Sequence, residues 1–180
     1  MLPVLPLLVS GVLGVIVGFS LKKYFDELQI GEQLITEKRV ITSEDIDRFA
    51  DLTGDHFYAH IKTTDFTGTM FEQQVAHGYF IMSIAAGLFV DGFEKNPVLL
   101  NYGIDELRFT KPVYPGAEVH IRFTCKEKLP NDKRVIEKPE DFKRGDDIDK
   151  GIVKWLVEFF DETNEITGVA TILTMVAKRP

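Results

Sequence analysis

The segment Val75–Val90, VAHGYFIMSIAAGLFV, decides the fold that this sequence predicts. It contains no Asp, Glu, Lys or Arg and is apolar on every side, so we expect a helix that is buried all round. At 16 residues it is short for a membrane span, and the acids Glu72 and Asp91 flank it. The segment therefore predicts a central core helix that other elements have to cover.

After this helix the pattern changes to that of β-strands, with alternating residues or with many β-branched and aromatic ones. Pro112, Pro115 and Gly116 separate the first two candidate strands. One buried helix with several antiparallel strands predicts an α+β domain, in its simplest form a sheet wrapped round the helix. The expected strands are Gly103–Thr110, Ala117–Lys126, Ile152–Asp161 and Thr167–Lys178.

A shorter helix is expected before the central one, between Thr42 and Gly54. The hydroxyl of Thr42 can cap free N–H groups, and the acids Glu44 and Asp45 lie at the positive end of the helix dipole. Gly54 is a natural stop. Further along the chain, residues 126–150 carry 16 charges in 25 positions, which indicates a solvated loop.

Length and composition restrict the class of protein. A chain of 180 residues has room for one domain with a sizeable core. The single cysteine, Cys125, excludes an intramolecular disulfide framework and a Cys-rich zinc site, and it fits a reducing compartment. The net charge of −7 argues against a nucleic-acid-binding protein, which normally has a basic face.

The first 21 residues contain no charged side chain. As a helix, Leu2–Leu21 is long enough to cross a bilayer core, and Lys22 and Lys23 follow it directly. With those lysines inside, the rest of the chain would be cytoplasmic and anchored at the inner face of a membrane. The alternatives are a secretory signal, a remnant of a gene start or fusion, and a helix packed on a partner. We therefore divide the chain into an apolar segment, 1–21, and a domain, 22–180.

Asp55 and His60 are the candidates for acid–base chemistry. They lie five residues apart in GDHFYAH, after the expected helix stop and among aromatic residues that would bury them and exclude water. A carboxylate and an imidazole held together there can share one water molecule, one taking its proton and the other protonating the substrate. The alternative is structural: Asp55 caps a turn, and His60 satisfies a hydrogen bond in the core.

His77 and Gly78 open the central helix. Backbone N–H groups at a helix start are unpaired, so they could polarise a thioester carbonyl placed there. Gly78 would allow the close approach, or it would only permit tight packing. His56, His60 and His77 also lie near Asp55 in the sequence, but their spacing is poor for metal ligands on a helix. We therefore expect no metal.

These residues, in this order, resemble the MaoC-like hydratases, a family that includes the (R)-specific enoyl-CoA hydratases. The resemblance covers Tyr24–Lys178 and is carried by FADLTGDHFYAH and by VAHGYF with AAGLFVDG. It implies a hot-dog fold, in which a curved antiparallel sheet wraps one long helix. It also implies Asp55 and His60 as the catalytic pair and a backbone oxyanion donor at Gly78. Dimers or larger assemblies with acyl-CoA near the subunit interface are implied too, with the CoA thioester as substrate and no cofactor.

Within the family, the chain is similar to the C-terminal hydratase domain of the bifunctional ring-opening enzyme of phenylacetate degradation. HFYAH, NYGIDELRFTKPVYPG, FTCKEK and ILTMVAK carry this closer resemblance. Phe57 and Tyr58 stand where most of the family has Asn-Pro, which points to this subgroup rather than to the hydratases of fatty acid metabolism. The subgroup's aldehyde dehydrogenase domain is absent from this chain, so a separate dehydrogenase is an expected partner.

The sequence therefore predicts an enoyl-CoA hydratase, which adds water to the double bond of a 2-enoyl-CoA with a linear or ring-type acyl group. In this hypothesis His60 removes the proton of the water and Asp55 protonates the α-carbon, although either group can act as acid or base. Because CoA is anionic and the protein is acidic, the substrate needs a local basic patch. A non-catalytic acyl-CoA-binding protein and an acyl-CoA thioesterase are the alternatives. The expected substrate-binding residues are Phe57, Tyr58, His77, Arg108 and Lys111, with Lys62, Lys126 and Lys128 as further candidates for the basic patch.

Overall fold

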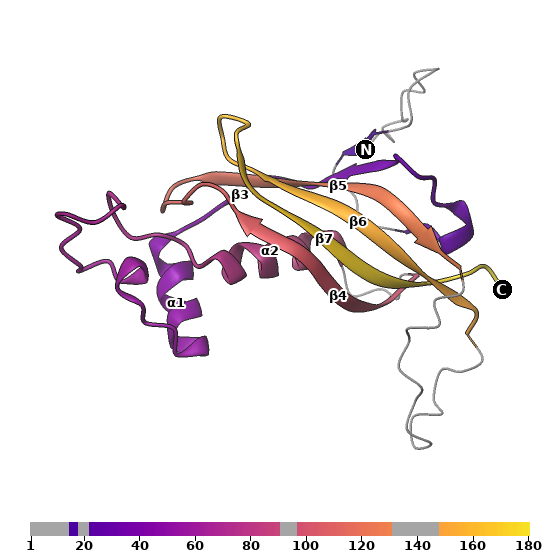
Figure 1. Ribbon diagram of the computed structural model, residues 1–180, viewed down its shortest axis with the longest axis horizontal. Helices are drawn as coiled ribbons and strands as arrows, with labels where there is room; N and C mark the ends of the chain where they lie inside the picture. Colours follow the sequence, from indigo (N-terminus) through magenta and orange to yellow (C-terminus); the bar gives the residue numbers. More distant parts are fainter. Residues whose placement is uncertain (1–14, 18–21, 91–96, 131–147) are drawn as a thin grey trace, which may run out of the picture.

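One curved sheet and one long helix make up most of the described structure. The computed structural model describes residues 15–17, 22–90, 97–130 and 148–180. Within these ranges seven strands form one sheet in the order β1-β2-β5-β6-β7-β4, with β3 paired to β5. Figure 1 shows the sheet curving over helix α2, with helix α1 beyond one end of it. The four long strands pair antiparallel, which confirms the predicted α+β hot-dog architecture.

The elements follow in the order of three short strands, two helices and four long strands, with two short 3-10 helices between them. The strands are β1 (Val15–Val17), β2 (Gln33–Ile35), β3 (Arg39–Val40), β4 (Val98–Phe109), β5 (Glu118–Leu129), β6 (Lys150–Phe160) and β7 (Ile166–Ala177). The helices are η1 (Phe25–Glu27), α1 (Ser43–Thr53), η2 (Tyr58–His60) and α2 (Gly78–Val90).

The four long strands match the predicted ones, with two extensions. β4 begins at Val98 rather than at Gly103, and β5 runs on to Leu129. Most of the predicted charged loop, residues 131–147, lies outside the described residues. The short strands β1, β2 and β3 were not predicted, because two or three residues are too few to show an alternation.

Helix α1 begins and ends where its caps predict. The backbone N–H of Asp45 donates to the Thr42 hydroxyl at 3.1 Å, and the Asp45 carboxylate accepts from the Thr42 N–H at 3.2 Å. This reciprocal pair satisfies two N–H groups at the helix start. At the other end Gly54 has a φ of 76°, a left-handed conformation that glycine adopts without strain.

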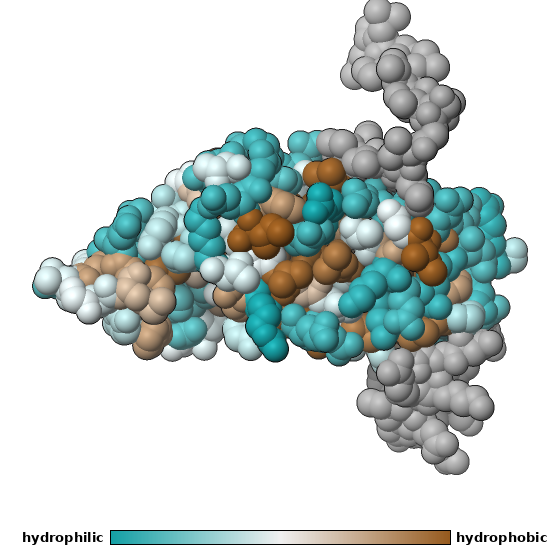
Figure 2. All heavy atoms as spheres, turned by 45° about the horizontal axis from the view of Figure 1, so that its top comes forward, coloured by the Kyte–Doolittle hydropathy of each residue, from teal (hydrophilic) through white to brown (hydrophobic). Residues whose placement is uncertain are grey.

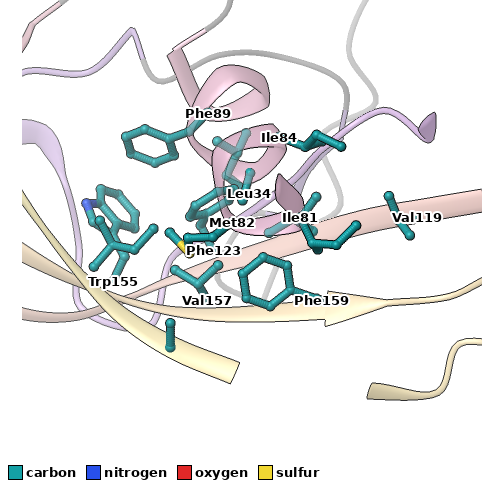
Figure 3. Packing of buried hydrophobic residues seen from close by; sticks show 14 of the residues in the cluster. Leu34, Ile81, Met82, Ile84, Phe89, Val119, Phe123, Trp155, Val157 and Phe159 are labelled. Atoms are coloured by element: carbon teal, nitrogen blue, oxygen red, sulfur yellow. The ribbon is translucent and has the colours of Figure 1, made fainter. Parts of the chain in front are cut away.

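Helix α2 packs one side against the inner face of the sheet and forms the centre of the core. Figure 3 shows Phe89 near Trp155 and Phe123, and Ile81 near Phe159. The rings of Phe89 and Phe123 lie 4.6 Å apart between centroids. Burial of these large apolar side chains stabilises the fold by roughly 1.5–3 kcal/mol for each one.

The prediction that α2 is buried all round is wrong for the single chain. Tyr79 is 69% exposed, and Ser83 and Gly87 are also exposed. These residues are four apart, so they form one stripe along the helix. The sheet covers only one side of α2, and in the described structure this stripe faces away from the buried core.

The apolar segment at the start of the chain is described only in part. Val15–Val17 form β1, which pairs parallel with β2, so these three residues are not part of the expected helix. The rest of the segment, residues 1–14 and 18–21, lies outside the described residues. In the described ranges no helix is both long enough and apolar enough to span a bilayer.

Cys125 lies in β5 within the core. Its side chain is fully buried, and burial raises the pKa of its thiol to about 11. Because the thiolate is the reactive form of cysteine, this side chain is inert in the folded protein.

Candidate active site

The loop between α1 and η2 brings the candidate acid–base residues to the start of α2. The His60 N–H donates to the Phe57 carbonyl at 2.8 Å, which closes the turn of η2. The N–H of Val75 donates to the carbonyl of Ala59 at 2.8 Å. This bond ties the loop to the segment that leads into α2, although the two are distant in the sequence.

His60 is held in one tautomer by a backbone carbonyl. Its Nδ1 lies 2.8 Å from the carbonyl oxygen of Val75. A carbonyl oxygen can only accept a hydrogen bond, so Nδ1 carries the proton and donates. The Nε2 atom of neutral His60 therefore has a free lone pair, as a general base requires.

His77 is buried directly behind His60. Its ring is 2% exposed, and its Nε2 donates to the backbone carbonyl of Asp55 at 3.0 Å. Its Nδ1 is buried without a hydrogen-bond partner among the described residues. Burial lowers the pKa of His77 below its usual value of 6.5, the hydrogen bond to Asp55 opposes this in part, and the nearby His60 lowers it further. The predicted role of His77 in binding substrate has no support from this position, because the side chain offers almost no surface.

Asp55 lies beside these two rings with its carboxylate open to solvent. One ligand-type atom from each of Asp55, His60 and His77 lies within 4.8 Å of the others. The carboxylate accepts a hydrogen bond from the Phe57 N–H at 3.3 Å. Phe57 and Tyr58 are 54% and 40% exposed, so in the single chain they do not bury Asp55 as the sequence suggested. They project instead from the rim of the site.

The ring geometry favours acid–base chemistry at this cluster over metal binding. In each histidine one ring nitrogen bonds a backbone carbonyl, as is common for metal ligands. The rings of His60 and His77, however, are stacked with centroids 3.7 Å apart and planes 26° apart. Their lone pairs lie in the ring planes, so they run side by side rather than converging on one point between them.

A cleft of about 300 Å³ adjoins the cluster at the start of α2. Val75 and Gly78 line it, whereas Asp55 and His60 do not. A Cβ on Gly78 would lie 2.2 Å from the ring of Phe109, so glycine is required for this ring to pack against the helix start. Most of the lining is apolar: Met70, Phe71, Val75, Ala76, Gly78, Ile81, Phe109, Thr110, Lys111, Pro112, Val113, Phe159 and Thr167.

The two basic residues predicted to contact CoA differ in their surroundings. The ammonium of Lys111 lies 2.6 Å from Asp161 and 2.5 Å from Glu165, and these contacts raise the pKa of Lys111 above its usual range. Its charge is thus already neutralised. Arg108 is exposed, and among the described residues its guanidinium donates only to the carbonyl of Leu107, at 2.8 Å. Of the two, Arg108 is the one with charge available for an anion.

Gly78 and Lys111 line the cleft as residues that the sequence singled out, but the large apolar side chains that shape it were not predicted. Met70, Phe71 and Phe109 come together there from two separate segments. The one signal in the sequence was Gly78, because a glycine at an expected oxyanion donor leaves space above the helix start. A large side chain such as Phe109 then has to fill the part of that space that a substrate does not occupy. Pairing of that kind depends on long-range packing and cannot be read from spacing.

Comparison with solved structures places the chain among hot-dog proteins. A monoamine oxidase regulatory protein from Archaeoglobus superposes with a TM-score of 0.71 at 26% identity, over 89% of this chain and 99% of that one. A Mycobacterium tuberculosis protein with a double hot-dog fold superposes with a TM-score of 0.64 at 16% identity, over 88% of this chain and 45% of that one.

The chain belongs to the MaoC-like domain family, whose profile matches residues 26–143. Protein MaoC of Klebsiella aerogenes is 48% identical over 116 residues, which is 64% of this chain and 34% of that protein. The 3-hydroxyacyl-thioester dehydratase Z of Mycobacterium tuberculosis is 33% identical over 81 residues, 44% of this chain and 54% of the dehydratase. The chain therefore spans about a third of the first relative and about half of the second.

Proposed function

We propose that this protein is an enoyl-CoA hydratase of the hydro-lyase class. The observation that carries the proposal is the tautomer of His60. Because Nδ1 donates to Val75, the Nε2 lone pair is free beside the Asp55 carboxylate and next to the start of α2. Membership of the MaoC-like family, and the similarity to a 3-hydroxyacyl-thioester dehydratase, support the same chemistry, since dehydration is hydration in reverse.

In the proposed reaction the thioester carbonyl accepts a hydrogen bond from the Gly78 N–H, which has no partner inside the helix. His60 Nε2 removes a proton from water, and the water oxygen forms a bond to the β-carbon. The electron pair of the double bond shifts toward the thioester oxygen. The α-carbon of the enolate takes a proton from Asp55, whose exposed carboxylate first takes up that proton from solvent. His60 then releases its proton to solvent, so the sum is one water added to one double bond.

The proposed substrate is a 2-enoyl-CoA with a ring-type acyl group, and no cofactor is needed. The mostly apolar lining of the cleft, with Phe71 and Phe109 in it, supports a bulky acyl group. The exposed rings of Phe57 and Tyr58, which lie 4.5 Å apart between centroids and are tilted by 56°, support the likeness to the phenylacetate subgroup. Under this proposal a separate dehydrogenase handles any aldehyde product.

The proposed active form is a homodimer. The exposed stripe of α2 and the strand β4, which ends the sheet order opposite β1, leave apolar surface open in the single chain. Leu99, Leu100 and Ile104 of β4 are 38–47% exposed. Sedimentation of the full chain tests this part of the proposal: a dimer is expected at micromolar concentration, and a monomer with full activity contradicts it.

The catalytic proposal is tested by a turnover screen over short, medium and ring-type enoyl-CoAs. Replacing His60 by Ala should lower the hydration rate about 10²–10⁴-fold. The matched control is His56→Ala, since His56 is exposed and lies four residues away. Wild-type hydration by purified His60→Ala would sink the mechanism. Release of free CoA would indicate a thioesterase, and tight binding without turnover would indicate a non-catalytic acyl-CoA-binding protein.

A further inference from the structure

We infer that His77 is a positioning residue that holds Asp55 and His60 in place, rather than a residue that contacts the substrate. The catalytic consequence of this inference rests on the proposed function. The side chain of His77 is 2% exposed, so it has almost no surface to offer to an acyl-CoA. Its Nε2 atom is directed instead at the loop that carries the acid–base pair.

The first contact is the hydrogen bond from His77 Nε2 to the Asp55 carbonyl, at 3.0 Å. This bond fixes the main chain at Asp55. The carboxylate of Asp55 is exposed and has no cation within ion-pair distance among the described residues. The preceding residue, Gly54, is in a left-handed conformation that many side chains cannot adopt, so the loop turns sharply there. The His77 bond defines where the chain goes after that turn.

The second contact is the stack of His77 on His60, with ring centroids 3.7 Å apart. Phe49 of α1 packs on the same His77 ring at 5.0 Å. One buried ring therefore joins α1, the Asp55 loop and the start of α2. Since the ring plane of His60 is set by this stack and by its bond to Val75, the direction of its free Nε2 lone pair is set too.

The third observation is the unpartnered Nδ1 of His77. In a protonated ring this atom would carry an N–H that has no acceptor among the described residues, and burial already disfavours the charged form. His77 is therefore neutral. A neutral ring stacked on His60 allows His60 to take up a proton during the reaction without a like charge beside it.

Two substitutions separate the hydrogen bond from the ring. His77→Phe keeps an aromatic ring for the stack but removes the donor to Asp55, whereas His77→Gln keeps a donor near the Nε2 position without the ring. We expect kcat to fall about 10–100-fold in His77→Phe with KM within about twofold, and His77→Gln to recover most of the loss. His120→Phe is the matched control, because His120 also has a buried, unpartnered Nδ1. Wild-type kcat in His77→Phe, or an equal loss in the control, overturns the inference.

A second measurement does not depend on hydratase activity. The amides of His56 and His60 are hydrogen-bonded within the Asp55 loop, at 3.1 and 2.8 Å. In His77→Phe their hydrogen exchange should become about tenfold faster, while the amides of β6 keep their protection. If the wild type hydrates no enoyl-CoA, the proposed function fails, and the exchange rates still decide the positioning role. Unchanged exchange in the loop overturns it.

Discussion

Ionisable side chains cluster both at the start of α2 and at the tip of the β6–β7 turn. The two clusters differ in whether these side chains form ion pairs. At the β6–β7 turn Asp161 and Glu165 both form ion pairs with Lys111. At the start of α2 one carboxylate and one imidazole form none among the described residues. The two groups of residues are the turn cluster, Lys111, Asp161 and Glu165, and the helix-end cluster, Asp55, His60 and His77.

In the turn cluster the charges are fully used by the fold. Asp161 accepts hydrogen bonds from the backbone and hydroxyl of Thr163 and from the backbone N–H of Glu165, besides its contact with Lys111. These bonds fix the turn between β6 and β7 and join it to Lys111, which lies two residues after the end of β4. A substrate would have to break an existing ion pair to use any of these groups.

In the helix-end cluster the hydrogen bonds go to the backbone and leave the reactive atoms free. His60 and His77 each donate to a carbonyl, and within the described part of the chain the Asp55 carboxylate accepts only a long bond from the Phe57 N–H. Ionisable residues gathered in one place therefore do not define a site by themselves. What distinguishes the site is a set of groups that the fold orients without neutralising.

The largest effects are expected when one carboxylate is removed from each cluster. Asp55→Asn should lower kcat about 10²–10⁴-fold and leave stability nearly unchanged, because Asp55 is exposed. Asp161→Asn should cost about 1–3 kcal/mol of unfolding free energy, because Asp161 is 5% exposed and holds several donors. Its effect on kcat should stay within about threefold. Initial rates and denaturant unfolding measure both, and the reverse pattern would remove the distinction between the clusters.

The next largest effect is expected at the backbone donor beside the helix-end cluster. In Gly78→Ala the new Cβ would meet the Phe109 ring at 2.2 Å, so the ring has to move into the cleft. We expect a loss of about 1–3 kcal/mol in stability and a fall in kcat of about tenfold or more. Adding Phe109→Ala should restore part of the stability, which thermal unfolding of the single and double variants will show. Full additivity of the two changes would mean that this contact is unimportant.

Charge reversal gives a smaller effect and compares Arg108 with Lys111. Arg108→Glu should raise KM for CoA esters about threefold to tenfold at constant kcat, because its guanidinium has no acidic partner among the described residues. Lys111→Glu should instead lower stability, since it places three carboxylates together around Asp161. Steady-state kinetics with one enoyl-CoA checks both. An unchanged KM in both variants would exclude these two residues from CoA binding.

The smallest expected effect is on the pH dependence of stability. The two clusters lose their contributions to stability in different pH ranges. Burial lowers the pKa of His77, so the unfolded chain binds the proton first and stability falls as the pH drops below about 6.5. Burial alone would raise the pKa of Asp161, but hydrogen bonds from Lys111 and Thr163 hold it below its usual value, so its contribution is lost only below about pH 3.8.

Each group contributes a slope of at most about 1.4 kcal/mol per pH unit. His120 shifts in the same direction as His77, so the comparison needs both His77→Gln and His120→Gln. We expect each variant to flatten the stability curve between pH 6.5 and pH 5 without affecting the part below pH 4. Urea unfolding across this range is the measurement, and a curve that keeps its slope in both variants would contradict the assignment.

The elements that could be predicted from the sequence are those with a repeated or capped pattern. The central helix, the four long strands and the caps of α1 at Thr42 and Gly54 each have several residues that indicate the same structure. The exposed stripe of α2 could not be predicted, because it depends on how far the sheet wraps round the helix. The sequence pattern of a uniformly apolar helix is the same whether the side away from the sheet is covered by its own chain or left exposed.

For the candidate site, the spacing of Asp55 and His60 was enough to place both residues in one loop. Their geometry could not be predicted, because it depends on the carbonyl of Val75, which is 15 residues from His60, and on the ring of His77, which is 22 residues from Asp55. The ion pairs of Lys111 were missed for the same reason, since its partner Asp161 is 50 residues further on. The catalytic roles themselves stay predictions.

The buried thiol of Cys125 provides a built-in probe for local opening of the core. Because it is the single cysteine and is buried in the core on β5, which pairs with β6, a thiol reagent can reach it only when that part of the core separates. The rate of labelling at low denaturant therefore measures how often the sheet parts from the helix, without any added probe. Bound acyl-CoA, if it bridges α2 and the strands, would slow that labelling in proportion to its occupancy.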